Sequence, residues 1–424
     1  MPDVIVTGYA AIAPAAMDAA ALHARILGGQ SCLRSHPRFE ALGFPNSAAG
    51  FIDAAQWRRI DAAVPAGSDP TLGPRSRLAL VLAHAALADA GLDPSTLGEA
   101  RCTLNLGANK FCAGLDDFDH AVSALQPDGR IGMDALLATP GPAEPHPYRV
   151  DEPALALARA LGLAQAPQVH SDACAAGSIA IGSGYRAILE GRAEIALCGA
   201  IELLANELPY FMFHSLGALC DRAELAPHAQ SRPFTRDRAG LVLGEGAALL
   251  VLESPAHARR RGARSRGRVL GFDNRAEAQK ITASDPAGEK YAECMAAALA
   301  DAGLDLDAID HVNAHGTSTR LNDACEAAAL GRLFGPRLER ISLTANKSAL
   351  GHSLAAGGAL EAVLSLVAME RGEVLPTLNC SAADLEYPTL GLSDRPLRQP
   401  IRHALSNSFG FGGQNSCLVL GRAA

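Results

Sequence analysis

The chain has 424 residues and a formal net charge of −8, with 49% hydrophobic but only 4% aromatic residues. This length allows two or three domains or one large duplicated domain, and the hydrophobic content is sufficient for a sizeable core. The acidic balance provides no basic footprint for nucleic acid.

The first residues, MPDVIVTGYAAIAP, contain Asp3 and no basic stretch, so we expect no secretory signal. No apolar run reaches the ~20 residues that a membrane span requires, so we expect no such span. The ten cysteines show no CxxC pair and no metal-ligand spacing, which predicts no metal site. Together these features predict a cytoplasmic protein with reduced thiols.

Strands and helices alternate along the first half of the chain. DVIVTG (3–8) is a β-branched run that predicts a buried strand, and the periodic stretch 75–93 predicts a helix that ends at Gly91. Residues 126–150 are rich in Pro and Gly and predict an irregular segment. The remaining expected elements are a strand at 101–108, a helix at 152–162, a strand near 167–170, a helix at 175–190, a strand at 194–202, and either two strands or one bent strand at 240–253.

The basic segment HARRRGARSRGR (257–268) predicts a solvated surface turn and a boundary between halves at 1–256 and 257–424. After it the pattern of strand and helix restarts. The ending ADAGLD occurs in both halves, and a Gly/Ala-rich loop opens a helix in each. This echo predicts a duplicated α/β domain with buried sheets.

Cys174 lies where a strand should end and a helix begin, in the sequence SDACAAGS. The free N–H groups and the positive dipole end of a helix N-terminus favour a thiolate, which is the nucleophilic form of cysteine. The small neighbours leave room for a substrate. A structural role is the usual one for a single cysteine, so the prediction of a nucleophile depends on partners elsewhere in the chain.

The second half supplies such partners on loops that follow predicted strands. His315 lies in NAHGTSTRLND (313–323), and Lys347 and His352 lie in NKSALGHSLAAGG (346–358). Ligands gather beyond the carboxyl ends of strands in open α/β sheets, so we expect these side chains to meet. The Gly-rich loop SNSFGFGGQN (406–415) lacks the Lys-Ser/Thr ending of a P-loop, and its backbone N–H groups suit an oxyanion instead.

These motifs, together with DACAAG (172–177), RPFTRDRAGLVLGEGAALLVLE (232–253) and LPTLN (375–379), occur in an order that resembles the β-ketoacyl-[acyl carrier protein] synthases. The resemblance covers nearly the whole chain and is to the elongating and polyketide enzymes with a Cys-His-His set. It implies the thiolase fold, with duplicated halves in α-β-α-β-α layers. The implied reaction is condensation of an acyl group with malonyl carrier protein and loss of CO₂.

The resemblance also implies roles for individual residues. Cys174 would hold the acyl group, and His315 and His352 would promote decarboxylation and stabilise the enolate. Lys347 and Glu326 would maintain the local field and the hydrogen-bond network. The backbone N–H groups of Cys174 and Phe411 would form an oxyanion hole, with Phe411 as a gate, while Thr317 and Thr319 would contact the phosphopantetheine arm. No cofactor is implied beyond the phosphopantetheine that the carrier protein brings.

Two positions depart from the family pattern, Asp172 before the cysteine and Asn346 before the lysine. Both favour a specialised branch over housekeeping fatty acid synthesis. Phe211, Met212 and Phe213 lie where the family builds its acyl pocket at a dimer interface, where they either shape the pocket or simply pack.

The implied partners are an acyl carrier protein and a second ketosynthase subunit, as a homodimer or as a heterodimer with a chain-length-factor-like subunit. The carrier protein is acidic, so Arg58, Arg59, Arg75 and Arg77 are candidate docking residues by clustering. Two alternatives are a non-catalytic chain-length-factor-like subunit and a thiolase-type acyltransferase. The first would lack the nucleophile, and the second would use coenzyme A without decarboxylation.

Overall fold

The computed structural model describes residues 3–98, 100–109, 149–280 and 284–423, with residues 122, 124–128, 130 and 132–138 between the second and third of these ranges. About half of the 126–150 segment that the sequence predicts to be irregular, including 139–148, therefore lies outside the described residues. Helix α6 (Met133–Ala138) falls within it.

Eleven of the described strands form one sheet, in the order β13-β11-β10-β15-β16-β9-β1-β8-β6-β4-β5. The two halves repeat one strand order. From the outside of the sheet toward its centre, the first half has β5-β4-β6-β8-β1 and the second half, inside the edge strand β13, has β11-β10-β15-β16-β9, so in both halves the third, second, fourth, fifth and first of these strands along the chain lie side by side. The first strands of the two sets, β1 and β9, pair antiparallel at the centre. The duplication predicted from the sequence echo is thus visible in the topology. The strands of the sheet are β1 (Val4–Ile12), β4 (Cys102–Gly107), β5 (Gln168–His170), β6 (Ile195–Glu202), β8 (Gly246–Glu253), β9 (Gly267–Ala276), β10 (His311–Asn313), β11 (Ser342–Thr344), β13 (Gly391–Leu392), β15 (His403–Gly410) and β16 (Gln414–Gly421).

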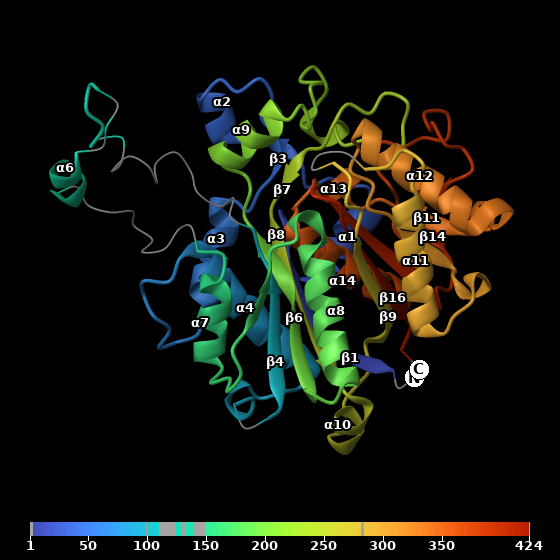
Figure 1. The fold of residues 1–424 in the computed structure, drawn as a ribbon, viewed down its shortest axis with the longest axis horizontal. Helices are drawn as coiled ribbons and strands as arrows, with labels where there is room; N and C mark the ends of the chain where they lie inside the picture. Colours follow the sequence, from blue (N-terminus) through green and yellow to red (C-terminus); the bar gives the residue numbers. More distant parts are fainter. Residues whose placement is uncertain are drawn as a thin grey trace.

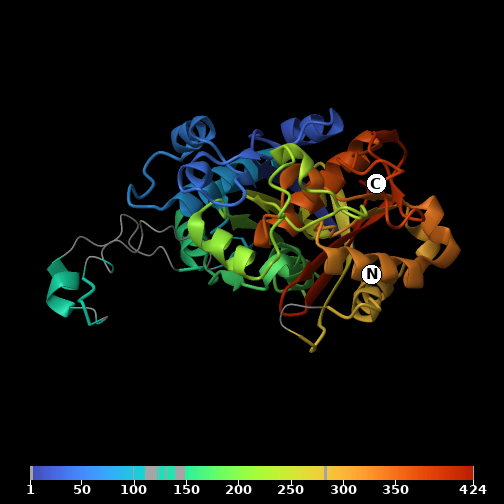
Figure 2. The ribbon, with the colours of Figure 1, turned by 90° about the horizontal axis from the view of Figure 1, so that it is seen from above.

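Two helices, α8 (Ala176–Leu189) and α14 (Ala355–Arg371), occupy equivalent places in the two halves and pack against each other. Each also contacts strands of both halves, so together they form the middle layer. Helices α4 (Pro74–Ala90) and α7 (Glu152–Ala160) cover the outer face of the first half, and α11 (Glu289–Ala302) and α12 (Arg320–Phe334) cover that of the second. The result is the layered thiolase-type arrangement. Most of the first half lies on the left and the second half on the right in Figures 1 and 2, while β1 and α1 lie right of the centre in Figure 1.

Smaller elements surround these layers. Two short sheets combine β2 (Arg34–Ser35), β3 (Ala48–Gly50) and β7 (Leu243–Gly244), and β12 (Glu373–Val374) with β14 (Leu397–Arg398). The remaining α-helices are α1 (Ala19–Leu27), α2 (Pro37–Ala41), α3 (Ala54–Ala63), α9 (Glu207–Ser215), α10 (Pro255–Arg260) and α13 (Lys347–Leu350). The 3-10 turns are η1 (Pro94–Thr96), η3 (Ala173–Ala175), η4 (Pro227–Ala229), η5 (Leu306–Ala308) and η6 (Gly335–Arg340).

The central helices can approach closely because small residues lie at their crossing. A Cβ atom at Gly177 of α8 would lie 2.5 Å from the backbone oxygen of Ala355 in α14, and one at Gly358 would lie 2.3 Å from Oγ of Ser178. The scarcity of aromatic residues and the abundance of Ala and Gly therefore reflect tight packing in the middle layer.

The basic segment 257–268 is less solvated than the sequence predicts. It contains the end of α10, a turn and the start of β9. Its arginines are used in ion pairs: Arg261 pairs with the buried Glu253, and Arg266 pairs with Asp89 and Glu370. These pairs fasten the connection between the halves to the surrounding helices and strands.

Within the described residues, no helix combines the length and apolar character needed to cross a membrane. Strands β10, β11 and β15 are mutually parallel where they pair, as are β4, β5 and β6. Their carboxyl ends therefore share an edge within each half, and the loops that leave these ends carry the residues described next.

Candidate active site

Cys174 lies in the turn η3 between β5 and the first residue of α8, as the sequence predicts. Only 4% of its surface is exposed. The preceding residue, Ala173, has a φ of +49°, a conformation that L-residues other than Gly rarely adopt. The turn therefore places the cysteine at the N-terminal end of a 14-residue helix, where the positive dipole end stabilises a thiolate.

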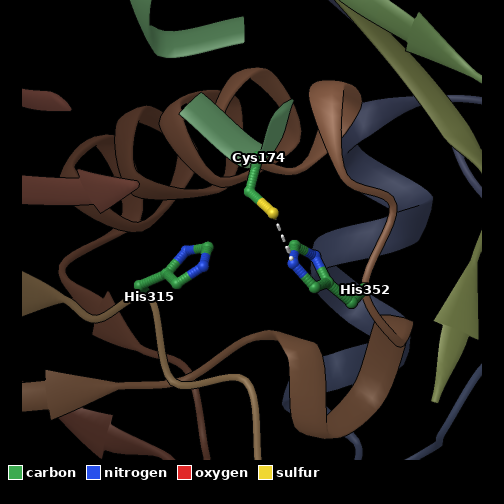
Figure 3. A group of neighbouring side chains, drawn as sticks. All are labelled: Cys174, His315 and His352. Atoms are coloured by element: carbon green, nitrogen blue, oxygen red, sulfur yellow. Dashed lines mark hydrogen bonds between the residues drawn. The ribbon is translucent and has the colours of Figure 1, made fainter. Parts of the chain in front are cut away.

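His352 and His315 meet Cys174 from two separate loops of the second half (Figure 3). Nε2 of His352 lies 3.1 Å from Sγ of Cys174. The two imidazole rings are 5.3 Å apart between centroids and nearly perpendicular, at 81°. One ligand-type atom from each of the three residues lies within 4.8 Å of the others, so the convergence predicted from strand-exit loops is present.

Burial keeps all three groups neutral near pH 7. It raises the pKa of the Cys174 thiol to about 12, against the opposing effects of the Lys347 charge and of the backbone N–H of Phe411. Burial and the Lys347 charge hold the pKa of both His315 and His352 well below the ordinary value. Neutral imidazoles carry one N–H donor and one acceptor nitrogen each, which suits proton relay and oxyanion stabilisation.

Lys347 has a buried carboxylate partner that the sequence analysis missed. Its Nζ atom lies 2.7 Å from Oε1 of Glu361, and both side chains are almost fully buried. Asn313 donates to the other oxygen of Glu361 at 3.4 Å, and Asn346 donates to Asn313 at 2.8 Å. The signal for Glu361 was available, because it is the only charged residue between 355 and 369 of an otherwise apolar helix.

The ammonium of Lys347 also bears on whether Cys174, His315 and His352 could bind a metal ion. Its charge already opposes protonation of both imidazoles. The same charge would oppose a metal ion bound to these side chains. The electrostatics thus favour a nucleophile with two neutral imidazoles over a metal centre.

Glu326 shapes the loop that carries His315. Its two carboxylate oxygens accept the backbone N–H groups of His315 and Gly316, each at 2.9 Å, and Asn407 donates to it at 3.0 Å. Burial raises the pKa of this carboxyl to about 7. Glu326 thereby fixes the direction in which the His315 side chain leaves the backbone.

The loop between β15 and β16 lies over Cys174. A Cβ atom at Gly410 would lie 3.1 Å from the backbone nitrogen of Cys174, so the glycine permits the close approach. The backbone N–H of Phe411 favours the thiolate and lowers the pKa of Cys174, against the larger opposite effect of burial. The Phe411 ring is half-buried and stacks on Phe213, with 6.2 Å between centroids and 27° between planes.

A cavity of about 400 Å³ opens onto this site and is lined by all three of Cys174, His315 and His352. Thr317 and Thr319 also line it and are bonded to each other through their hydroxyl oxygens at 2.8 Å. Tyr291 and Phe409, stacked with 3.6 Å between centroids, form the wall next to His315. The nucleophile is therefore buried but reachable by a narrow substrate.

The three candidate pocket residues of α9 are separated by the structure. Phe213 is buried in the same apolar cluster as Cys174, and Met212 packs against that cluster. Phe211 is 42% exposed and contacts Phe44. Phe213 stacks on the Phe411 ring beside the nucleophile, and Met212 and Phe411 pack against the same apolar cluster.

The candidate docking arginines also differ from one another. Arg58 and Arg59 are exposed on α3, whereas Arg77 is partly buried and pairs with Asp61. Arg75 is only 2% exposed and donates to the backbone oxygens of Asn109 and Arg149. The expectation of a docking role for Arg75 is wrong, because the helical period of α4 turns its guanidinium into the core.

Comparisons with known proteins agree with this site. Family models match both halves: "Beta-ketoacyl synthase, N-terminal domain" over residues 1–258 and "Beta-ketoacyl synthase, C-terminal domain" over residues 266–381. The chain is 34% identical over 421 residues, 99% of this chain and 97% of the other, to the tetracenomycin polyketide synthase ketoacyl synthase alpha subunit of Streptomyces glaucescens. It is also 32% identical, over an alignment of 450 positions, to a 3-oxoacyl-[acyl-carrier-protein] synthase 2 of Rhizobium meliloti. That alignment covers 100% of this chain and 99% of the other.

Solved structures extend the similarity over the whole of both chains. One is a type II polyketide synthase acyl carrier protein in complex with its ketosynthase bound to the hexaketide, with a TM-score of 0.87 and 28% identity. Another is the ishigamide ketosynthase/chain length factor, with a TM-score of 0.86 and 29% identity. By its family models, its relatives and its thiolase-type layers, this chain belongs to the β-ketoacyl synthase family of condensing acyltransferases.

Proposed function

We propose that Cys174 accepts an acyl group from an acyl carrier protein and that His315 and His352 then direct its condensation with a malonyl group on a second carrier protein. The observation that carries this proposal is the 3.1 Å contact between Nε2 of His352 and Sγ of Cys174, beside His315 at the floor of the cavity. A nucleophile and a base within hydrogen-bond reach are the geometric signature of covalent catalysis.

In the first half-reaction, Sγ of Cys174 attacks the thioester carbonyl of the incoming acyl group. Nε2 of His352 takes the thiol proton, and the departing carrier thiolate receives it. The oxygen of the tetrahedral intermediate becomes negative, and we infer that the backbone N–H groups of Cys174 and Phe411 donate to it. Both N–H groups already favour negative charge at this point, because they lower the pKa of the Cys174 thiol. The products are acyl-Cys174 and the free thiol of the carrier arm.

In the second half-reaction, the malonyl group loses CO₂ and becomes an enolate. The neutral imidazoles of His315 and His352 donate N–H groups to its oxygen, as their lowered pKa values allow. For His352 this requires the tautomer with the proton on Nε2, because that nitrogen no longer accepts the thiol proton once Cys174 is acylated. The enolate carbon attacks the acyl carbonyl, and the thiolate of Cys174 leaves. One proton from solvent then restores the thiol. The Lys347–Glu361 pair and Glu326 hold these histidines in their orientation and neutral state.

The cavity fits a substrate that arrives on a narrow arm. Thr317 and Thr319 offer hydroxyl groups along its wall, and Phe411, stacked on Phe213, gates the apolar region beside Cys174. We infer that the arm is the phosphopantetheine of the carrier protein and that no other cofactor takes part.

We infer a polyketide or specialised fatty acid pathway, although the relatives also include 3-oxoacyl-[acyl-carrier-protein] synthases. The named relatives include a polyketide ketosynthase alpha subunit, and one structural neighbour is a ketosynthase/chain length factor. We infer that this chain works as a dimer, with a second copy or with a chain-length-factor-like subunit, and that it acts in the cytoplasm. The chain-length-factor alternative is less favoured because the nucleophile and both histidines are in place.

Intact-protein mass spectrometry with a panel of acyl-loaded carrier proteins tests the proposal. We expect an acyl adduct on the wild-type protein and none on the Cys174→Ala variant. Addition of malonyl carrier protein should then release the adduct with CO₂, whereas a thiolase would need acetyl-coenzyme A instead. Failure of every carrier to acylate the protein, with and without a chain-length-factor partner, would overturn the proposal.

A further inference from the structure

A side-chain amide lies directly behind the nucleophile and joins it to a buried carboxylate. Nδ2 of Asn109, just after β4, lies 2.8 Å from Oε2 of Glu202 and 3.4 Å from the backbone oxygen of Ala173. Asn109 is 3% exposed and Glu202, the last residue of β6, is not exposed at all. Because an amide nitrogen carries two hydrogens, it can donate to both acceptors at once.

The contact with Ala173 bears on the Cys174 N–H. The carbonyl of Ala173 and the N–H of Cys174 belong to one planar trans peptide, so they point in opposite directions. Holding the oxygen from behind therefore aims the N–H forward, toward the cavity. Ala173 also occupies the left-handed region, with a φ of +49°, which a residue with a Cβ keeps only when its surroundings impose it.

Asn109 is itself fixed in place. Nη1 of the buried Arg75 donates to its backbone oxygen at 3.4 Å, and Nη2 of Arg75 donates to the backbone oxygen of Arg149 at 2.9 Å. The arginine charge also offsets that of the Glu202 carboxylate. Arg75, Asn109 and Glu202 thus form a buried, hydrogen-bonded group that contacts the peptide before Cys174.

We propose that Asn109 and Glu202 are positioning residues for the nucleophile: the Glu202 carboxylate orients the Asn109 amide, and this amide holds the Ala173–Cys174 peptide so that its N–H faces the reacting oxyanion. The inference rests on the proposed function of Cys174. Neither residue touches the substrate, and both act through the peptide that precedes the thiol.

Asn109→Ala separates this role from general damage to the site. Transfer of an acyl group needs the oxyanion donor, whereas alkylation of the thiol by iodoacetamide does not. We expect the rate constant of acyl transfer to fall at least tenfold in Asn109→Ala, while alkylation of Cys174 does not slow. A parallel fall of both rates, or an unchanged acyl transfer, would overturn the proposal.

Glu202 variants test the second link. Glu202→Leu should lower the rate of acyl transfer as Asn109→Ala does. Glu202→Gln should keep most of the wild-type rate, because its amide oxygen still accepts a hydrogen bond from Asn109.

Glu202→Gln also removes a charge that faces Cys174. His315, His352 and Lys347 from the second half also lie around the thiol, and the described charged residues that line the cavity are Asp221, Lys280 and Arg320. The Glu202 charge raises the pKa of the thiol, so Glu202→Gln should alkylate several-fold faster at pH 7.5.

Glu245→Gln provides the matched control. Glu245 directly precedes β8, next to the end of β6, and burial raises its pKa to about 7, as it does for Glu202. Both its oxygens accept backbone N–H groups, from Ile52 and Ala205, so an amide fits there less well than at Glu202. Faster alkylation in Glu245→Gln than in Glu202→Gln would overturn the proposal.

Two outcomes separate this inference from the proposed function. If the wild-type protein accepts no acyl group, the proposed function fails. If the wild-type protein accepts an acyl group and the Asn109 and Glu202 variants accept it equally fast, only this inference is refuted.

Discussion

The ammonium of Lys347 and the carboxylate of Glu361 lie 2.7 Å apart, with side chains only 2% and 1% exposed. They come from α13 and α14, on the two sides of the loop that carries His352. A buried pair of this kind gains little over an apolar pair, but removal of one partner leaves a charge without compensation. The pair therefore fastens the His352 loop and at the same time sets the local potential.

We predict that Lys347→Met lowers the free energy of unfolding by about 3 kcal/mol, because Glu361 is left buried and unpaired. Glu361→Leu should cost a similar amount. The double variant should recover at least half of the summed loss, since both charges are then gone. Urea unfolding of the four proteins measures the coupling, and strictly additive losses would show that the pair has no energetic coupling.

Much of this site is predictable from sequence, for a reason visible in its construction. Cys174 and His315 follow strands within a few residues, and His352 follows the one-turn helix α13 that comes after β11. Short segments of this kind have strong local sequence signals. The strand predicted at 194–202 is found as β6, which begins one residue later and ends at the predicted residue. The helix predicted at 175–190 is found as α8, with both ends one residue inside the predicted ones.

The residues that support the site are harder to predict. Asn109 and Glu202 lie 93 positions apart and meet only because β4 pairs with β6. The clustering of arginines in the sequence also led to a wrong docking prediction for Arg75. This side chain points inward from α4, whereas Arg58 and Arg59 are exposed and Arg77 pairs with Asp61 near the surface. Such contacts depend on sheet order, which no local pattern contains.

The crossing of α8 and α14 predicts a steric effect at Gly177. Gly177→Ala places a Cβ atom 2.5 Å from the backbone oxygen of Ala355, and the backbone cannot yield cheaply. We expect a loss of about 1–3 kcal/mol in the free energy of unfolding, together with slower acylation because Cys174 is three residues away.

Gly331→Ala is the control for this substitution. Gly331 lies in α12, and a Cβ atom there meets nothing within 4 Å. The alanine should stabilise the protein by about 0.5–1 kcal/mol through helix propensity and reduced entropy of the unfolded chain. Equal effects of the two substitutions would show that the helix crossing imposes no special constraint.

The exposed arginines of α3 give a prediction for carrier-protein docking. Arg58→Glu and Arg59→Glu should raise KM for the acidic carrier protein, more strongly at low salt, because exposed charges act mainly on encounter. The rate of Cys174 alkylation should not change. Arg332→Glu, an exposed arginine in the last turn of α12, is the matched control. A KM unaffected by both α3 substitutions would exclude this surface as the dock.

The buried thiol predicts an unusual pH dependence for its reaction with iodoacetamide. The thiolate is the reactive form, and burial raises the pKa of Cys174 to about 12. Below that pKa the thiolate fraction rises tenfold per pH unit, so the alkylation rate should climb between pH 7 and pH 10 without a plateau. Mass spectrometry of the Cys174 peptide follows the reaction, with Cys174→Ala identifying modification at other cysteines. A plateau below pH 9 would mean that His352 and the dipole of α8 outweigh burial and hold a resting thiolate. In that case Cys174 would attack the acyl group without first passing its proton to His352.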